Sequence, residues 1–500
     1  MEKQSLSKEK IFSSLIIFIQ FLCIYVVIRL SHDGTTALGA VVFALLYALI
    51  CLIYIHRCGI RVSRRSGPLL ALSAVSLSQV FFCGNEFLRR LSLLVAFTLF
   101  TFALYLGCRP SIKHFNSDPL PEDLLRCFAC DISVDSISKH TNRPNKETKM
   151  NSILPAFWKG ILGLVLGIPV FLVAGALLSY DSSFQDLIDS IFTFDMSKLA
   201  EETFLIIASL LVFLYLFLIL TSLAKDESDN RSDYGLINNI FKKISFLPPI
   251  TVFVSVIPLL LLYTLFFISQ WKYYTSAFVG SLPSGYSYAE YAREGFFQLC
   301  TVSTINLLVL FSCTWLIKKN KTRDQILLKV ITHWISVYSM ILIATAMSKM
   351  YLYMKEYGLT PLRVYSSWGM MVLAAIFILF IVKGILNRFP FYTACIYTVV
   401  VLFLGLVISN PEKQIARYNT YQFFEGNLNS VDLYLLEELG DPAVPYLLEL
   451  EGHLPLEDRA EYNLILRDLE SLYTEKVESS KKWTESTYDY LTAKRLVNGE

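Results

Sequence analysis

The sequence predicts an all-α fold: a polytopic α-helical integral membrane protein with about eleven spans and a small external α-helical cap at the C-terminus. Three observations support this fold class. The 500 residues are 54% hydrophobic and 17% charged, whereas soluble domains are about a quarter charged. Apolar runs of about 17 to 25 residues, long enough to cross a bilayer as a helix, recur along the chain. From Asn410 onward the chain becomes polar, as expected of a segment outside the bilayer.

The apolar runs divide the chain into regions. The first run follows a basic leader and is too long for the core of a signal peptide, so we interpret it as an uncleaved span. The predicted spans are 11–30, 36–55, 68–84, 90–107, 157–179, 203–224, 247–269, 296–317, 326–349, 367–386 and 390–409. They define an N-terminal four-span region (1–108), a loop (109–155), a seven-span core (156–409) and a cap (410–500).

The distribution of basic residues predicts the orientation of the chain. A cytoplasmic N-terminus places the most basic loops inside, as the positive-inside rule requires. These loops contain Arg57, Arg61, Arg64, Arg65, Lys242, Lys243, Lys318, Lys319, Lys321, Arg323, Lys383 and Arg388. An odd number of spans then places the cap on the extracytoplasmic side. Because topology explains the basic clusters, they do not indicate nucleic-acid binding.

The cysteines predict neither a disulfide framework nor a metal site. Most of the ten lie in or beside apolar runs, where they act as small hydrophobic residues. Cys127 and Cys130 form a pair in the loop 109–155, but no second pair stands at the spacing of a zinc site. We therefore expect a short amphipathic helix with two buried thiols there, and no metal or cofactor.

Two features surround the end of the fifth predicted span. Gly160, Gly163 and Gly167 would let another helix approach closely. Beyond the span, the apolar residues of 184–192 recur with helical spacing and leave aspartates on the opposite face. This pattern predicts an amphipathic helix on the outer membrane surface.

The stretch 270–297 separates the seventh and eighth predicted spans. It is rich in aromatic residues and carries Glu290, Arg293 and Glu294 close to where the membrane should begin. The residues 282–285 have the composition of a turn, and Ser287 followed by Glu290 is a capping box. A helix is therefore expected to begin near Tyr288.

This stretch also carries a family resemblance. Its residues read Leu282-Pro283-x-Gly285-x-Ser287-Tyr288-Ala289-Glu290-Tyr291-Ala292-Arg293-x-Gly295-Phe296-Phe297. Similar words follow in order at Tyr357-Gly358-Leu359-Thr360-Pro361-Leu362-Arg363-Val364 and at Asn410-Pro411 with Ile415-Ala416-Arg417-Tyr418-Asn419. The pattern resembles a bacterial membrane family known as domain of unknown function 4153, and its sibling 4173, over roughly residues 155–500. The resemblance implies a protein of the bacterial cytoplasmic membrane and implies no activity.

The matched words all fall on the predicted outer side, which suggests a shared ligand or partner site there. Its candidate residues are Glu290, Arg293, Glu294, Arg363, Arg417 and Asn419. The alternative interpretation is that these residues cap helices and form ion pairs at the membrane surface, because perturbed charges are often only structural.

The C-terminal segment predicts a small helical domain. A helix over 431–439 should end at Gly440, and a second should begin at Asp441-Pro442 and run to about Leu450. This pair is similar to one unit of a HEAT-type repeat. One such unit cannot bury its own apolar face, so it should pack on the membrane domain or on a partner. A third, amphipathic helix is predicted over 458–473.

The predicted spans contain essentially no ionisable residue, which argues against ion-coupled transport. Asn306 and His333 are the best intramembrane polar groups, and no Walker, HExxH or GxSxG motif is present. The leading hypothesis is therefore a non-enzymatic envelope sensor, scaffold or regulator. Besides the lipid bilayer, its partner at the outer face would be a protein, a peptide or a lipid headgroup.

Two alternatives remain open. The first is a permease or flippase for an amphipathic solute, with a path lined by Asn306, His333 and Tyr338. The second is a membrane enzyme on lipid-linked substrates, with Glu290 or Glu294 as a base and Arg293 on a phosphate. Neither carboxylate has a second acid or a metal-ligand set beside it in the sequence.

Overall fold

The computed structural model describes residues 19–31, 37–57, 63–108, 196–223, parts of 254–268, 288–316, 322–386, 389–474 and 486–499. Within these ranges all regular structure is helical, which confirms the predicted class. Several predicted features lie outside the described residues. They are the span 157–179, the amphipathic segment 184–192, the loop 109–155 with its cysteine pair, and the turn 282–287.

Six helices of the described chain are long and apolar enough to cross a membrane, so the chain is a membrane protein. They are α2 (Leu38–Arg57), α4 (Glu86–Cys108), α13 (Tyr288–Leu316), α14 (Thr322–Tyr357), α15 (Pro361–Ile385) and α16 (Phe391–Ser409). Shorter apolar helices occur at Ile19–Ser31, in α3 (Gly67–Phe82), in α9 (Met196–Leu223) and at Val256–Leu265. The number of eleven spans therefore stays a prediction.

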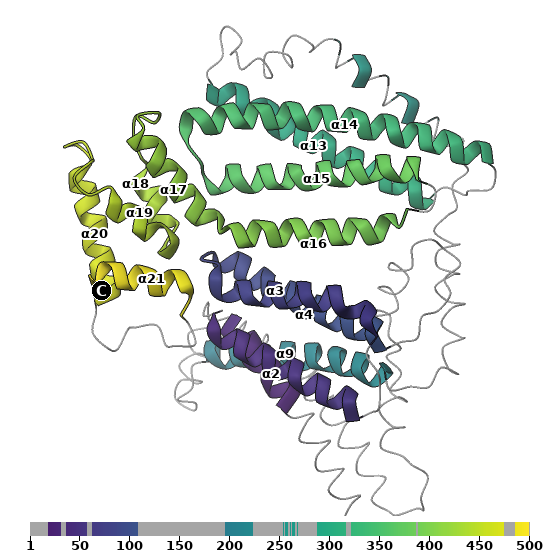
Figure 1. Ribbon diagram of the computed structural model, residues 1–500, viewed down its shortest axis with the longest axis horizontal. Helices are drawn as coiled ribbons and strands as arrows, with labels where there is room; N and C mark the ends of the chain where they lie inside the picture. Colours follow the sequence, from purple (N-terminus) through teal and green to yellow (C-terminus); the bar gives the residue numbers. More distant parts are fainter. Residues whose placement is uncertain are drawn as a thin grey trace, which may run out of the picture.

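The N-terminal helices form one bundle with α9 (Figure 1). Its core contains Tyr47, Cys51, Phe102 and Phe213, which come from α2, α4 and α9. Helices α3 and α4 are joined closely because hydroxyl groups of α3 donate to carbonyl oxygens of α4. Ser73 and Ser76 make these bonds at 2.8 and 2.7 Å. Small polar residues at such an interface allow two membrane helices to approach closely.

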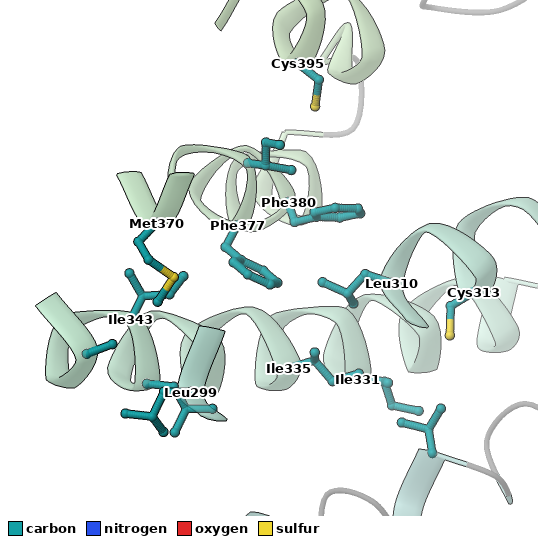
Figure 2. Packing of buried hydrophobic residues seen from close by; sticks show 14 of the residues in the cluster. Leu299, Leu310, Cys313, Ile331, Ile335, Ile343, Met370, Phe377, Phe380 and Cys395 are labelled. Carbon is teal, nitrogen blue, oxygen red and sulfur yellow. The ribbon is translucent and has the colours of Figure 1, made fainter. Parts of the chain in front are cut away.

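Helices α13 to α16 form the second bundle. Figure 2 shows its core, in which Phe377 and Phe380 of α15 point towards Leu310 of α13 and Ile335 of α14. The imidazole ring of His333 on α14 packs directly against Gly384 of α15, where a Cβ atom would lie 1.8 Å from its Cε1. A larger residue at 384 would therefore displace the His333 side chain.

The two bundles meet along α3, α4 and α16. Cys83 and Leu88 pack there against Phe403, Leu404 and Val407. This contact cluster lies near the end of α16 from which the chain enters the cap. A change in the relative position of the bundles would therefore alter contacts beside the cap.

Helix α14 is longer than the predicted span 326–349, because it continues to Tyr357. Lys349, which the sequence places at the end of the span, is consequently in the interior of the helix and is 0% exposed. The expectation that the spans contain essentially no ionisable group is wrong at this position. A buried lysine in a membrane helix is costly and often marks a functional position.

The ends of the helices separate two faces of the molecule. The α3–α4 turn (83–85), the α14–α15 turn (358–360) and the end of α16 lie beside the cap (Figure 1). At the opposite end, the amide of Ser63 donates to the carbonyl of Gly107, which places neighbouring Arg64 there. Lys383, in the last turn of α15, also lies at this end.

The described part of the cap (410–474 and 486–499) contains six helical elements. They are α17 (Pro411–Phe424), α18 (Leu433–Glu438), η4 (Asp441–Ala443), α19 (Val444–Glu449), α20 (Arg459–Thr474) and α21 (Tyr488–Val497). The helices expected in this segment are present at nearly the expected bounds. Gly440 ends α18 with a φ of 70°, a left-handed conformation that glycine adopts without steric cost.

The apolar faces of α18 and α19 are buried mainly within the cap. Leu436 and Leu447 pack with Ile415 of α17 and Ile465 of α20. From the second bundle, Leu359 also contacts this core. The helix pair thus packs its apolar face mainly on neighbouring helices of the cap. The sequence had suggested packing on the membrane domain or on a separate partner.

Candidate functional site at the junction of the cap and the two bundles

The chain enters the cap at Asn410, between α16 and α17. Asn410 has φ 48° and ψ 79°, a left-handed conformation that asparagine tolerates better than most residues. Pro411 then occupies the first turn of α17, where its missing N–H costs nothing. Glu412 follows in the same turn, where the positive end of the helix dipole favours a carboxylate.

Glu412 joins three parts of the molecule through one oxygen atom. Its Oε1 accepts a hydrogen bond from Asn85 Nδ2 at 2.6 Å and one from the hydroxyl of Tyr365 at 2.5 Å. Asn85 belongs to the α3–α4 turn of the first bundle, and Tyr365 belongs to α15 of the second. The cap therefore holds both bundles at the same atom.

Glu412 is deeply buried, with 3% of its surface exposed. Its second carboxylate oxygen, Oε2, has no hydrogen-bond partner among the described residues. Burial of a carboxylate oxygen without a donor carries a large desolvation cost. Such a cost in a native structure indicates either a functional role or a group that binds there.

Asn85 is itself held in place by the start of α4. Its Oδ1 accepts from the amide N–H of Leu88 at 2.9 Å, an arrangement that caps the helix. Its Nδ2 also lies 3.3 Å from the hydroxyl of Tyr365. The bond to Leu88 thus holds the Asn85 side chain in the orientation in which it donates to Glu412.

A second polar contact links α16 to the last helix of the cap. Asn410 Nδ2 donates to Asp489 Oδ2 at 2.6 Å. Asp489 lies in the first turn of α21 and is 4% exposed. Burial raises the pKa of Asp489; the hydrogen bond from Asn410 and the charge of Lys413 oppose that rise, and the carboxylates of Asp441 and Glu412 reinforce it.

The α3–α4 turn fits tightly against the cap at Gly84. A Cβ atom on Gly84 would lie 2.1 Å from Cγ of Pro442 in η4 and 3.1 Å from Oδ2 of Asp489. Asp441, which precedes Pro442, accepts a hydrogen bond from the hydroxyl of Tyr473. We use "the junction" for Gly84, Asn85, Tyr365, Asn410, Glu412, Asp441, Pro442 and Asp489.

Two residues of the sequence-predicted outer site, Arg363 and Asn419, meet at the α14–α15 turn. Asn419 Oδ1 accepts from the N–H of Leu359 at 2.7 Å, and its Nδ2 donates to the carbonyl of the same residue at 2.8 Å. Arg363 donates to the carbonyls of Tyr357 and Gly358, and its guanidinium lies 4.0 Å from the ring centre of Tyr353. Both side chains therefore hold the turn.

We expect Asn419→Ala to loosen this turn and to lower the free energy of unfolding by about 2 kcal/mol, because the partly buried N–H and carbonyl of Leu359 lose their partners. Hydrogen exchange at residues 357–360 should accelerate accordingly. Asn427→Ala, which changes an exposed asparagine near the end of the same helix, is the matched control. Unchanged exchange in Asn419→Ala would show that the residue does not hold the turn and would leave it available for a ligand.

The structure gives less detail on the other residues of the predicted outer site. Arg417 is exposed on α17. Glu290, Arg293 and Glu294 lie in the first two turns of α13, and their side chains are outside the described residues. The Asn306–Ser339 hydrogen bond sets the register of α13 antiparallel to α14, so these turns lie at the same end of the bundle as Arg363. The shared site stays a prediction.

The predicted intramembrane polar residues face different neighbours. Asn306 lies between α13 and α14 and donates to Ser339 Oγ at 2.9 Å, while its Oδ1 has no partner among the described residues. His333 packs against Gly384 of α15, and its Nδ1 lies 3.0 Å from the carbonyl oxygen of Lys329. The ring of Tyr338 stacks on Tyr263. The structure therefore places the three side chains in three separate contacts.

Sequence patterns did not predict the junction. The signal that could have found it is Asn410-Pro411-Glu412, a turn followed by a carboxylate, directly after an apolar span. Gly84 is the last residue of the predicted span 68–84, and Asn85 lies in the short connection to the span 90–107. Within the described ranges, no group of three or more His, Cys, Asp and Glu side chains could hold a metal ion.

Comparison with known proteins identifies the family. No match was found among curated proteins or among solved structures. The family model described as "Domain of unknown function (DUF4153)" matches residues 69–450. The match begins in α3, earlier than the resemblance read from the sequence, and ends before α20. Since it spans well over half of the chain, this protein belongs to the DUF4153 family.

Proposed function

We propose that this protein is a non-enzymatic regulator or sensor of the bacterial cell envelope. In this proposal the cap binds a protein, a peptide or a lipid headgroup outside the cytoplasmic membrane, and the junction transmits binding to the two bundles. The observation that carries the proposal is the position of Glu412, whose one oxygen accepts from both bundles. Any shift of α17 must therefore alter the contact between them.

The distribution of charge supports an external cap. Arg64 and Lys383 lie at the end of the molecule opposite the cap. Basic residues beside membrane spans are enriched on the cytoplasmic side. We therefore propose that the N-terminus faces the cytoplasm and that the cap faces the extracytoplasmic space.

The junction is better suited to coupling than to catalysis. Glu412 Oε1 is occupied by two donors of the protein itself, and Asp489 accepts from Asn410. Both carboxylates are nearly inaccessible to a substrate, with 3% and 4% of their surfaces exposed. Burial of this kind favours a role in holding elements together over a role in proton transfer to a bound substrate.

One observation favours the permease alternative. Lys349 is fully buried in the interior of α14, and ionisable groups inside membrane helices often line transport paths. In this alternative the second bundle would provide the path for an amphipathic solute. Flux of such a solute through proteoliposomes, with no partner bound to the cap, would favour it over the regulator.

The regulator proposal can be tested with one cysteine on the cap. Leu456 is 81% exposed, and we propose Leu456→Cys in a chain whose native cysteines are replaced by alanine. A membrane-impermeant maleimide with a photoreactive group should label this cysteine from outside intact cells. Light should then cross-link it to one discrete envelope protein, peptide or lipid.

The matched control is Arg64→Cys at the opposite end, which should remain unlabelled until the cells are opened. Labelling of the cap position only in opened cells would refute the orientation. Adducts with bulk lipid alone, equally at the cap and at other exposed positions, would refute a specific partner.

A further inference from the structure

The side chains of Asn410 and Asp489 meet in a buried contact between the end of α16 and α21. Asn410 Nδ2 donates to Asp489 Oδ2 at 2.6 Å. The amide oxygen of the same side chain, Oδ1, is buried and has no hydrogen-bond donor among the described residues. Asn410 as a whole is 9% exposed. One edge of the amide is thus satisfied and the other is not.

An amide and a carboxylic acid each present one donor and one acceptor. Placed edge to edge, they form a cyclic pair with two hydrogen bonds. A carboxylate has only acceptors and can make just one of these bonds, which leaves the amide oxygen without a partner. A proton on Asp489 Oδ1 would supply the missing donor to Asn410 Oδ1. A buried acceptor without a donor costs roughly 1 to 3 kcal/mol, so completing the pair is favourable.

We propose that Asp489 binds a proton when the cap is docked, and that this proton completes a cyclic acid–amide pair with Asn410. When the pH rises, the proton leaves to solvent and the cap is held less tightly on the bundles. The junction is therefore a proton-binding site, and its ligand regulates the contact between α21 and the end of α16. This inference does not depend on the partner proposed for the cap.

Two acidic neighbours of Asp489, Asp441 and Glu412, favour a bound proton, whereas Asn410 and Lys413 oppose it. Glu412 of α17 adds a second buried carboxylate with a donor-free oxygen, Oε2. Like charges in one buried site favour the neutral form of one member. In the described part of the chain, the titratable and charged groups that face the junction from the surrounding elements include Cys83, Arg89, Tyr365, Glu412, Lys413, Asp441 and Tyr473. Arg89 lies close to Glu86, Cys83 and Asp441, and Lys413 is partly exposed.

The direction of the pH effect follows from linkage. Burial, opposed in part by Asn410 and Lys413, raises the pKa of Asp489 in the docked state above its ordinary value. The docked state then binds the proton more tightly than the undocked state. Docking is fully stabilised below the ordinary aspartate pKa and weakens as the pH rises through the raised value.

Asp489→Asn tests the proposal because its amide can make the same cyclic pair at every pH. Hydrogen exchange of the α21 amides would be measured in the full-length wild type and in the variant at the same pH, so that the chemical exchange rate cancels in the ratio. The ratio of the α21 exchange rate in wild type to that in the variant should rise at least about threefold between pH 4 and pH 7 and then level off. The total rise should be about tenfold for each unit by which the pKa of Asp489 is raised in the docked state.

Asp432→Asn is the matched control, since Asp432 is an exposed cap of α18 in the same domain. The ratio of the α21 exchange rate in wild type to that in Asp432→Asn should not change with pH. A pH-independent ratio for Asp489→Asn, or faster α21 exchange in this variant than in the wild type at both ends of the range, would overturn the proposal.

A second measurement keeps the proposal testable if Asp489→Asn does not fold. In the wild-type protein, α21 exchange can be referred to the amides of α18, after correction for chemical exchange. α21 should lose protection relative to α18 as the pH rises, and constant relative protection would overturn the proposal. Where the variant folds, the infrared band of protonated carboxyls, recorded at a pH above the ordinary aspartate value, should be stronger in wild type than in the variant, and equal bands would count against the proposal.

Discussion

Replacing Gly84 with alanine is expected to separate the cap from the first bundle. The new Cβ would lie 2.1 Å from Pro442 Cγ, well inside van der Waals contact, and the proline ring cannot rotate away. Overpacking of a tight contact costs typically about 1 to 3 kcal/mol. Gly84→Ala should therefore shift the docked cap towards an open state by about tenfold to a hundredfold.

Cys83 provides a local reporter for this experiment. Its side chain is 0% exposed beside Gly84, so its thiol should react only when the junction opens. With the remaining cysteines replaced by alanine, labelling of Cys83 at constant pH should accelerate by the same factor in Gly84→Ala. Gly67→Ala is the matched control, because a Cβ at Gly67 meets nothing within 4 Å.

A compensating variant separates the steric clash from other effects of the alanine. Pro442→Ala removes the ring atoms that the new Cβ meets, so it should restore slow labelling of Cys83 in the Gly84→Ala background. Contacting residues are expected to couple in this way in a double-mutant cycle. Additive effects of the two substitutions would show that the contact between Gly84 and Pro442 does not hold the cap.

Glu412→Ala should weaken the assembly of the two bundles with the cap. The substitution leaves the Tyr365 hydroxyl without its acceptor and leaves Asn85 Nδ2 only the Tyr365 oxygen at 3.3 Å, in a partly buried site. Each unsatisfied group costs about 1 to 3 kcal/mol, so we expect a loss of roughly 2 to 4 kcal/mol in the free energy of unfolding. Thermal unfolding in detergent should show a lower Tm and, if the cap detaches first, an additional transition.

Glu412→Gln is the informative companion. The glutamine oxygen can accept both hydrogen bonds, and the amide carries no charge that must be desolvated. We expect it to change the stability by about 1 kcal/mol or less. Glu425→Ala, at an exposed position that ends the same helix, should be close to wild type. Equal losses in Glu412→Ala and Glu412→Gln would mean that the charge, and not the shared acceptor, stabilises the junction.

Much of the fold followed from local patterns. Apolar runs predicted the helices around α2, α4, α15 and α16, because the length of an apolar helix is set by the thickness of the bilayer. The Gly440 stop and the Asp441-Pro442 start predicted the elements of the cap, because glycine and proline act on the backbone of their immediate neighbours. The family motifs could likewise be identified from the sequence, because each consists of consecutive or nearby residues.

The junction could not be read in this way. Asn85 and Glu412 are 327 positions apart, and Asn410 and Asp489 are 79 apart. No periodicity connects such residues, because their pairing depends on how whole helices pack. The same limit applies to Arg363 and Asn419, which the sequence grouped for a ligand and the structure uses to hold a turn.

Sequence by itself determined that this is a helical membrane protein of the DUF4153 family with a helical C-terminal segment, since hydrophobicity and backbone preferences act over one or two turns of chain. Tertiary structure alone decided that Lys349 is buried, that Glu412 binds both bundles and that Asp489 meets Asn410. These contacts arise where the ends of separate helices converge, so their energies depend on desolvation and on donors supplied from distant parts of the chain.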